Sequence, residues 1–345
     1  MNKKNNFRHP LCIVSIFIVA LISISCILLW GFHNQNTQQN KKQITQKNSI
    51  QEPKSSKKQS AEPKESSSSK TTSASDTDWS VAKSSGSQVA FEKYFNPVID
   101  EYTTKKKGVA LGKIKKITYH STIIKEKREA YVYTPPGYQK NKTYPVLYLI
   151  HGIGASGEQW VSMQLNEIIS NMIANKEVIP FIAVCPSVVP PVGKKTNEAI
   201  SPENITAFAK FNKEFTTDLQ PYIQKHFPIS QKRKDTAICG LSMGGMKALD
   251  LGFRHLETFN YIGSFSAAPT LDTSLLKVEN KKNTPALVML SNGTADATVK
   301  DIPKDYHNIL TRNKVEHIWF QYPDEGHNGT VWINSLINFL KRIYR

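Results

Sequence analysis

The stretch Gly240-Leu241-Ser242-Met243-Gly244-Gly245 lies where an apolar run, Thr236–Cys239, gives way to a helical pattern. A serine between such small residues, at a sharp turn from strand to helix, is typical of the nucleophile elbow of a serine hydrolase. The turn strains the backbone of the serine, and bulky side chains two positions before or after it would collide. Gly240 and Gly244 meet that requirement, so the motif predicts a nucleophilic Ser242. A Gly-rich turn with an incidental serine is the alternative, and the flanking strand and helix patterns favour the catalytic interpretation.

From about residue 91 the sequence alternates strand and helix patterns, which predicts a mostly parallel sheet covered on both faces. Strands are expected at residues 114–123, 128–134, 146–150, 180–185, 236–239, 261–265, 286–290 and 317–322, and helices at 211–226, 246–255, 306–313 and 330–344. Continuous apolar runs such as residues 146–150 indicate strands that are buried on both sides. The predicted fold of residues 91–345 is therefore the three-layer sandwich of an α/β-hydrolase.

The N-terminal quarter of the chain has a different composition. Residues 1–10 are basic, and residues 11–32 are apolar and uncharged over a length that spans a bilayer as a helix. We predict a signal anchor with a cytoplasmic tail and an extracellular catalytic domain. A cleaved signal peptide, which would release a secreted protein, and a lipoprotein site at Cys26 are the alternatives. Residues 33–90 are rich in Gln, Asn, Lys and Ser, which predicts a disordered linker.

The chain is strongly basic, with 45 Lys and Arg against 28 Asp and Glu and a net charge of +17. This charge predicts contact with an anionic membrane or cell-wall polymer. The sequence lacks a basic-aromatic recognition pattern, so a nucleic-acid partner is not expected. Of the four cysteines, Cys12 and Cys26 lie in the apolar span. Cys185 and Cys239 end two predicted strands that flank a third in the usual hydrolase order, so we expect free buried thiols.

A nucleophilic serine needs a histidine to accept its proton and a carboxylate to orient that histidine. His327 follows the last predicted strand on a loop and is the expected base, whereas His307 and His317 lie within predicted elements and are expected to be structural. Asp296, in a turn after the strand at 286–290, is the expected acid. The rival carboxylates are Asp301, Asp324 and Glu325, and an ordinary turn aspartate is the alternative role for Asp296.

Oxyanion stabilisation requires two backbone N–H groups near the serine. Met243 would supply one of them at the start of the helix that follows the elbow. His151-Gly152-Ile153-Gly154 follows a buried strand and contains small residues that let backbone donors approach a substrate. We expect Ile153 to be the second donor and Gly152 to shape the loop, with a plain Gly-rich turn as the alternative.

Several blocks together carry a resemblance to a known family. They are Tyr133-Thr134-Pro135-Pro136-Gly137-Tyr138, Tyr144–Gly152, the elbow at 240–245, Gly293-Thr294-Ala295-Asp296, and Gly326-His327 followed by Trp332. Between about residues 112 and 342 the chain resembles the putative-esterase family of α/β-hydrolases. That family includes feruloyl and acetyl xylan esterases, S-formylglutathione hydrolase and mycolyltransferases. The resemblance implies a triad of Ser242, Asp296 and His327 with neither a metal nor an organic cofactor.

The position of Trp160 after the oxyanion loop looks most like that in secreted carbohydrate esterases, which implies that Gly152 and Trp160 bind substrate. Residues 186–204 would then form a loop over the cleft, either accepting an aromatic acyl group or packing as an ordinary loop. We predict a membrane-tethered serine esterase that cleaves feruloyl or acetyl esters on carbohydrate. An acyltransferase with a sugar or wall-polymer acceptor, and a noncatalytic wall-binding protein, are the alternatives.

Overall fold

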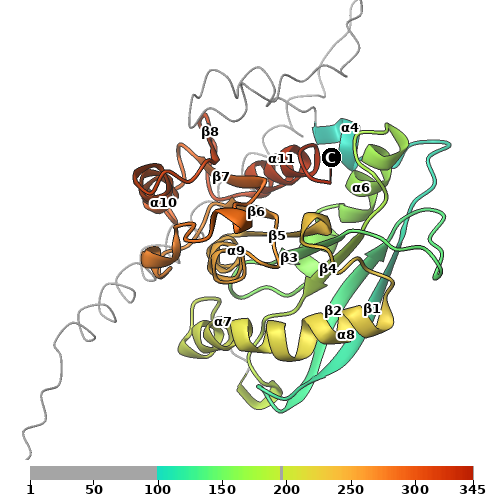
Figure 1. Ribbon diagram of the computed structural model, residues 1–345, viewed down its shortest axis with the longest axis horizontal. Helices are drawn as coiled ribbons and strands as arrows, with labels where there is room; N and C mark the ends of the chain where they lie inside the picture. The colour runs from blue at the N-terminus through green and yellow to red at the C-terminus, as the bar shows by residue number, and fades with distance from the viewer. Residues whose placement is uncertain (1–98, 195–196, 345) are drawn as a thin grey trace, which may run out of the picture. The chain divides into compact units, whose positions relative to one another are not determined.

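The computed structural model of the protein describes residues 99–194 and 197–344 (Figure 1). Within them one sheet has the strand order β1-β2-β4-β3-β5-β6-β7-β8. β1 pairs antiparallel with β2, and β2 with β4, whereas all later pairs are parallel. The strands are β1 (Lys113–Ser121), β2 (Glu126–Thr134), β3 (Val146–Ile150), β4 (Ile182–Pro186), β5 (Thr236–Leu241), β6 (Tyr261–Phe265), β7 (Leu287–Gly293) and β8 (Ile318–Tyr322).

Helices cover both faces of this sheet, as Figure 1 shows. They are α4 (Ile99–Thr103), α5 (Glu158–Ser162), α6 (Leu165–Ala174), α7 (Pro202–Glu214), α8 (Gln220–His226), α9 (Met243–Arg254), α10 (Ile302–Arg312) and α11 (Gly329–Leu340). Alternate residues of β3 belong to two separate cores: Tyr148 lies in the cluster that includes Phe211 of α7, and Leu149 lies in the cluster that includes Ile168 of α6. The predicted α/β-hydrolase fold with a mostly parallel sheet is thus present.

Each predicted strand is found, with bounds that shift by a few residues. The helix predicted over 211–226 begins earlier, at Pro202, where the Ser201 side chain accepts a hydrogen bond from the Asn204 amide and caps the helix. Residues Phe215–Leu219 form a π-helical turn between α7 and α8. Helix α6 was not predicted, although its buried Leu165, Ile168, Ile169 and Met172 follow helical spacing.

The predicted membrane span at 11–32 and the linker at 33–90 lie outside the described residues, as does the expected domain start at 91. Among the helices of the described part, none combines the length and the apolar character that a bilayer crossing requires. The anchor therefore stays a prediction from the sequence.

The cysteine prediction is confirmed for the two residues in the sheet. Cys185 and Cys239 are both free and buried. They lie on β4 and β5, which flank β3, so the sheet keeps the two thiols from pairing. Burial raises the pKa of both thiols, which leaves them protonated and unreactive.

Candidate active site

The predicted elbow is present at the junction of β5 and α9. Ser242 has φ 55° and ψ −123°, a conformation that L-residues rarely adopt. A Cβ on Gly240 would collide with the Gly244 carbonyl, and a Cβ on Gly244 would collide with the carbonyls of Ile150 and His151. The two glycines therefore allow the elbow to pack tightly against the end of β3. The Ser242 carbonyl accepts a hydrogen bond of 3.0 Å from the Ala268 amide, which holds the strained turn.

The three side chains predicted to form a triad lie in one hydrogen-bonded line. His327 Nε2 lies 3.0 Å from Ser242 Oγ, and His327 Nδ1 lies 2.8 Å from Asp296 Oδ2. A carboxylate only accepts, so Nδ1 carries the proton and Nε2 is free to accept from the serine hydroxyl. Asp296 is 4% exposed. This arrangement can deprotonate a serine as it attacks a carbonyl.

Backbone contacts hold the loops that carry the acid and the base against each other. The Ala295 amide donates to the Glu325 carbonyl at 2.9 Å, and a Cβ on Gly293 would collide with that same carbonyl. The other Asp296 oxygen, Oδ1, accepts from the amides of Thr298 and Val299, at 3.0 and 3.1 Å. These bonds orient the carboxylate before any substrate arrives.

An aromatic ring and an amide side chain support the same loop from the helix side. The ring of Trp332 stands edge-on to His327, with centroids 5.1 Å apart, and limits the positions that the imidazole can take. Asn328 caps α11 by accepting from the Val331 amide and also donates to Glu325. The Glu325 carboxylate therefore has a structural partner, Asn328. Neither of the rival carboxylates, Asp324 and Glu325, bonds to His327.

The expected oxyanion loop lies beside the serine. The Gly152 amide donates to Gln159 Oε1 at 2.9 Å, so it is not available to a substrate. A Cβ on Gly152 would contact the side chains of Leu241 and Ser242, which agrees with the expectation that this glycine shapes the loop. Met243 is the first residue of α9, and its N–H has no acceptor within the helix. The donor roles of Ile153 and Met243 stay predictions.

Sequence reasoning missed His151, which connects the oxyanion loop to the loop that follows β4. Its side chain is fully buried, with Nδ1 2.6 Å from the Gly152 carbonyl, and the Val188 amide donates to Nε2 at 2.7 Å. The amide needs an acceptor, so Nε2 is unprotonated and Nδ1 donates. Burial lowers the pKa of His151 to about 4. The ring forms a T-shaped pair with Phe208 of α7, with centroids 5.6 Å apart.

The expectation that Trp160 binds substrate is wrong. The indole is 0% exposed and donates from Nε1 to the Ile150 carbonyl at 3.1 Å, so it supports the end of β3 from within the core. Local spacing could not separate a tryptophan that borders the cleft from one that packs beneath it. His307 and His317 are structural, as expected: they bond to each other at 2.7 Å. In the described part of the chain, no three candidate metal ligands cluster.

The fold and this geometry define an α/β-hydrolase with a serine, histidine and aspartate in triad arrangement. The chain belongs to the family described as putative esterase, which matches residues 121–342. A solved structure of a CE1 ferulic acid esterase from Anaeromyces mucronatus is 31% identical, with a TM-score of 0.66, and the match covers 71% of this chain and 95% of that one. The S-formylglutathione hydrolase of Staphylococcus aureus, 18% identical at a TM-score of 0.50 over 67% of this chain and 100% of that one, shares the fold.

A sequence relative carries a related name. The endo-1,4-beta-xylanase/feruloyl esterase of Xylanibacter ruminicola is 32% identical over 173 residues, which is 47% of this chain. The aligned region is 22% of the length of that protein, so the similarity concerns one part of a larger enzyme.

Proposed function

We propose that this protein is a serine esterase that cleaves carboxylic esters on carbohydrate, with feruloyl or acetyl groups as the acyl part. The observation that carries the proposal is the line from Ser242 through His327 to Asp296, at 3.0 and 2.8 Å. The names of the Anaeromyces and Xylanibacter relatives support a feruloyl ester as the substrate.

In the proposed mechanism, Ser242 Oγ attacks the ester carbonyl while His327 Nε2 takes the hydroxyl proton. The negative charge that develops on the carbonyl oxygen is stabilised by the amides of Ile153 and Met243. His327 then gives the proton to the departing sugar hydroxyl, which leaves an acyl group on Ser242. A water molecule, deprotonated by His327, attacks this acyl-enzyme, and the acid leaves as the serine is regenerated. Asp296 holds the imidazole in the tautomer that each step requires.

An acyltransferase with a sugar or wall-polymer acceptor would use the same residues, and acceptor access would decide between the two reactions. A noncatalytic binding protein is the alternative from another class, and the intact hydrogen-bonded line argues against it.

We also propose that residues 11–32 tether the enzyme to the membrane with its catalytic domain outside the cell. N-terminal sequencing of the mature protein tests the tether, because a start after residue 32 would contradict it.

The experiment compares the full chain, purified in detergent, with its Ser242→Ala variant on methyl ferulate, p-nitrophenyl acetate and acetylated xylan. Ser274→Ala is the matched control, because Ser274 is exposed on a short 3-10 turn and its hydroxyl bonds to Asp272 rather than to a residue of the triad. We expect cleavage by the parent and the control only, and a mass increase equal to the acyl group on Ser242 when the enzyme is quenched during turnover. Equal rates for Ser242→Ala and the parent would refute the assignment. Acylated sugar formed with added sugar acceptors would favour acyl transfer.

A further inference from the structure

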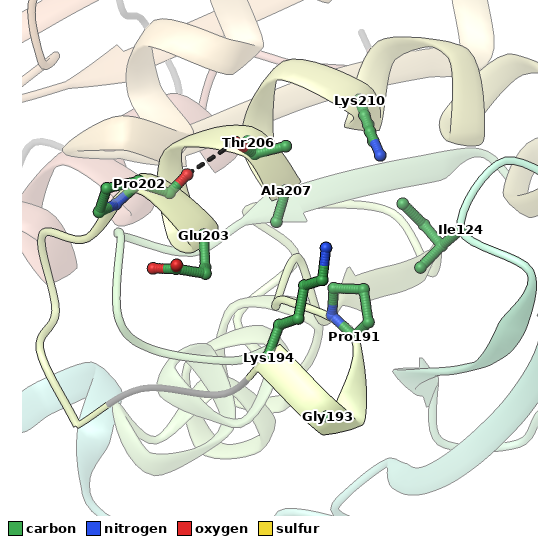
Figure 2. Close-up of a pocket in the computed structure, with 9 residues that line it drawn as sticks. All are labelled: Ile124, Pro191, Gly193, Lys194, Pro202, Glu203, Thr206, Ala207 and Lys210. Atoms are coloured by element: carbon green, nitrogen blue, oxygen red, sulfur yellow. Dashed lines mark hydrogen bonds between the residues drawn. The ribbon is translucent and has the colours of Figure 1, made fainter.

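A cavity of about 560 Å³ lies outside the triad, between α7, the turn after β1 and the loop that follows β4. Its walls include Ile124 of the turn, Pro191 and Lys194 of the loop, and Ala207 and Lys210 of α7 (Figure 2). Sites for small ligands fall in this range of volume. The walls combine apolar groups, which can pack against a sugar ring, with charged groups that can fix its orientation.

The charged groups of the cavity favour an anion. Figure 2 shows the amino groups of Lys194 and Lys210 directed into the same space, one from the loop and the other from the helix. Neither lysine forms an ion pair with any residue that the structure describes. The Glu203 carboxylate, also at the wall, is directed away from the two amino groups in Figure 2. Both lysines are exposed, and the cavity presents their two positive charges and the single negative charge of Glu203 among polar and apolar groups.

The loop that forms one wall of the cavity also touches the oxyanion loop. At its start, the Val188 amide donates to His151. Near its end, Ala199 packs against Gly154, where a Cβ would collide with it. Pro191, Gly193 and Lys194 lie between these two contacts and face the cavity. The loop therefore joins residues of the cavity wall to the oxyanion loop beside Ser242.

We propose that the cavity is a subsite for a negatively charged sugar unit, with a carboxylate or a phosphodiester, of the polysaccharide that carries the ester. The inference rests on the proposed function in one respect, that the polysaccharide carries the ester. The negative charge of the sugar unit is argued from the cavity alone. Lys194 and Lys210 would hold the anion, and Pro191, Ile124 and Ala207 would pack against the sugar. The enzyme would then select esters on acidic polysaccharides over esters on neutral ones.

Binding is measured first, in the full chain with Ser242→Ala, so that the result does not depend on hydrolysis. The variants are Lys194→Gln with Lys210→Gln, and Lys213→Gln as the control, because Lys213 is an exposed lysine of α7 outside the cavity. The ligands are an oligogalacturonide, a glycerol-phosphate oligomer and a neutral xylo-oligosaccharide. The binding of each ligand is measured by fluorescence titration. All variants keep the basic residues 1–90, so the contribution of that segment to ligand binding is the same in every protein compared.

We expect the double variant to bind an anionic ligand about tenfold more weakly than the parent, with the control unchanged. Loss for the oligogalacturonide alone identifies a carboxylate, and loss for the glycerol-phosphate oligomer alone identifies a phosphodiester. Unchanged binding of both anions in the double variant, or an equal loss in Lys213→Gln, would overturn the inference. With active enzyme, the double variant should keep the parent rate on methyl ferulate and show a higher KM on a feruloylated acidic oligosaccharide. A chain that binds the anion yet cleaves no ester would contradict the proposed function and leave the subsite standing.

Discussion

The buried His151 makes the stability of this protein sensitive to acid in a way that one substitution should remove. The ring is neutral in the fold because burial lowers its pKa to about 4, whereas in the unfolded chain it titrates near 6.5. Below about pH 6.5 the unfolded chain binds a proton that the folded protein does not, so stability falls with pH. The loss continues until the pH reaches the folded pKa and then levels off.

The size of this effect follows from the difference between the two pKa values. Each unit of difference corresponds to about 1.4 kcal/mol, so His151 costs the fold about 3 kcal/mol by pH 4. Between about pH 7 and pH 4.5 the loss is roughly 2 kcal/mol, a large share of the free energy of unfolding of an ordinary domain. His307 and His317 also have lowered pKa values through burial, so the parent loses stability from several groups at once.

His151→Gln isolates the contribution of this one residue. Glutamine offers an acceptor to the Val188 amide and does not titrate, so the variant should start less stable near pH 7 and lose less on acidification. Urea unfolding followed by tryptophan fluorescence at pH 7 and at pH 4.5 gives the stability that each protein loses over this range, and the two losses should differ by about 2 kcal/mol. His120→Gln, at an exposed position of β1, is the control. A His151→Gln protein with the same pH slope as the parent would refute the reasoning.

Three further substitutions test the site and its support. Asp296→Asn removes the charge that orients His327 and should lower kcat by about 10³- to 10⁴-fold with little change in fold, as measured by steady-state kinetics and circular dichroism. Gly244→Ala would place a methyl group against the Ile150 carbonyl, so we expect insoluble or inactive protein, and a soluble active one would contradict the elbow geometry. Arg128→Met removes the ion-pair partner of the buried Glu214 at 3.1 Å, leaves only the Tyr119 hydroxyl bonded to that carboxylate, and should lower the free energy of unfolding by about 3 to 5 kcal/mol in urea titrations.

The strands were predictable because their signal is local. Residues 146–150 form a continuous apolar run, and the sheet buries all five of them. The positions of Ser242, Asp296 and His327 followed from the same information, since each comes directly after a strand or its turn. In a parallel sheet these ends meet at one edge, so chain order was enough to bring the three together.

The residues that sequence reasoning missed or misplaced depend on contacts between distant segments. His151 gains its role from Val188, 37 positions away, and no local pattern indicates that pairing. Trp160 was expected in the cleft, but its indole reaches the Ile150 carbonyl in the core. The start of α7 was missed because the first turn of this helix carries exposed Ile205 and Thr206 rather than an apolar stripe.

The loop after β4 begins with residues held by buried hydrogen bonds and continues with exposed residues. This contrast indicates which part of the loop can change substrate preference. Arg128 donates to the Ser187 carbonyl and Ser187 Oγ accepts from the Gly157 amide, so buried polar bonds hold the start of the loop. Only a few residues later Val192 is 72% exposed. Changes in the middle of the loop would alter the cavity while the bond from Val188 to His151 keeps the oxyanion loop in position. Substitutions at residues 191–194 can therefore change substrate preference and leave the geometry at Ser242 intact. The contact that holds the oxyanion loop is made by Val188 and not by these residues.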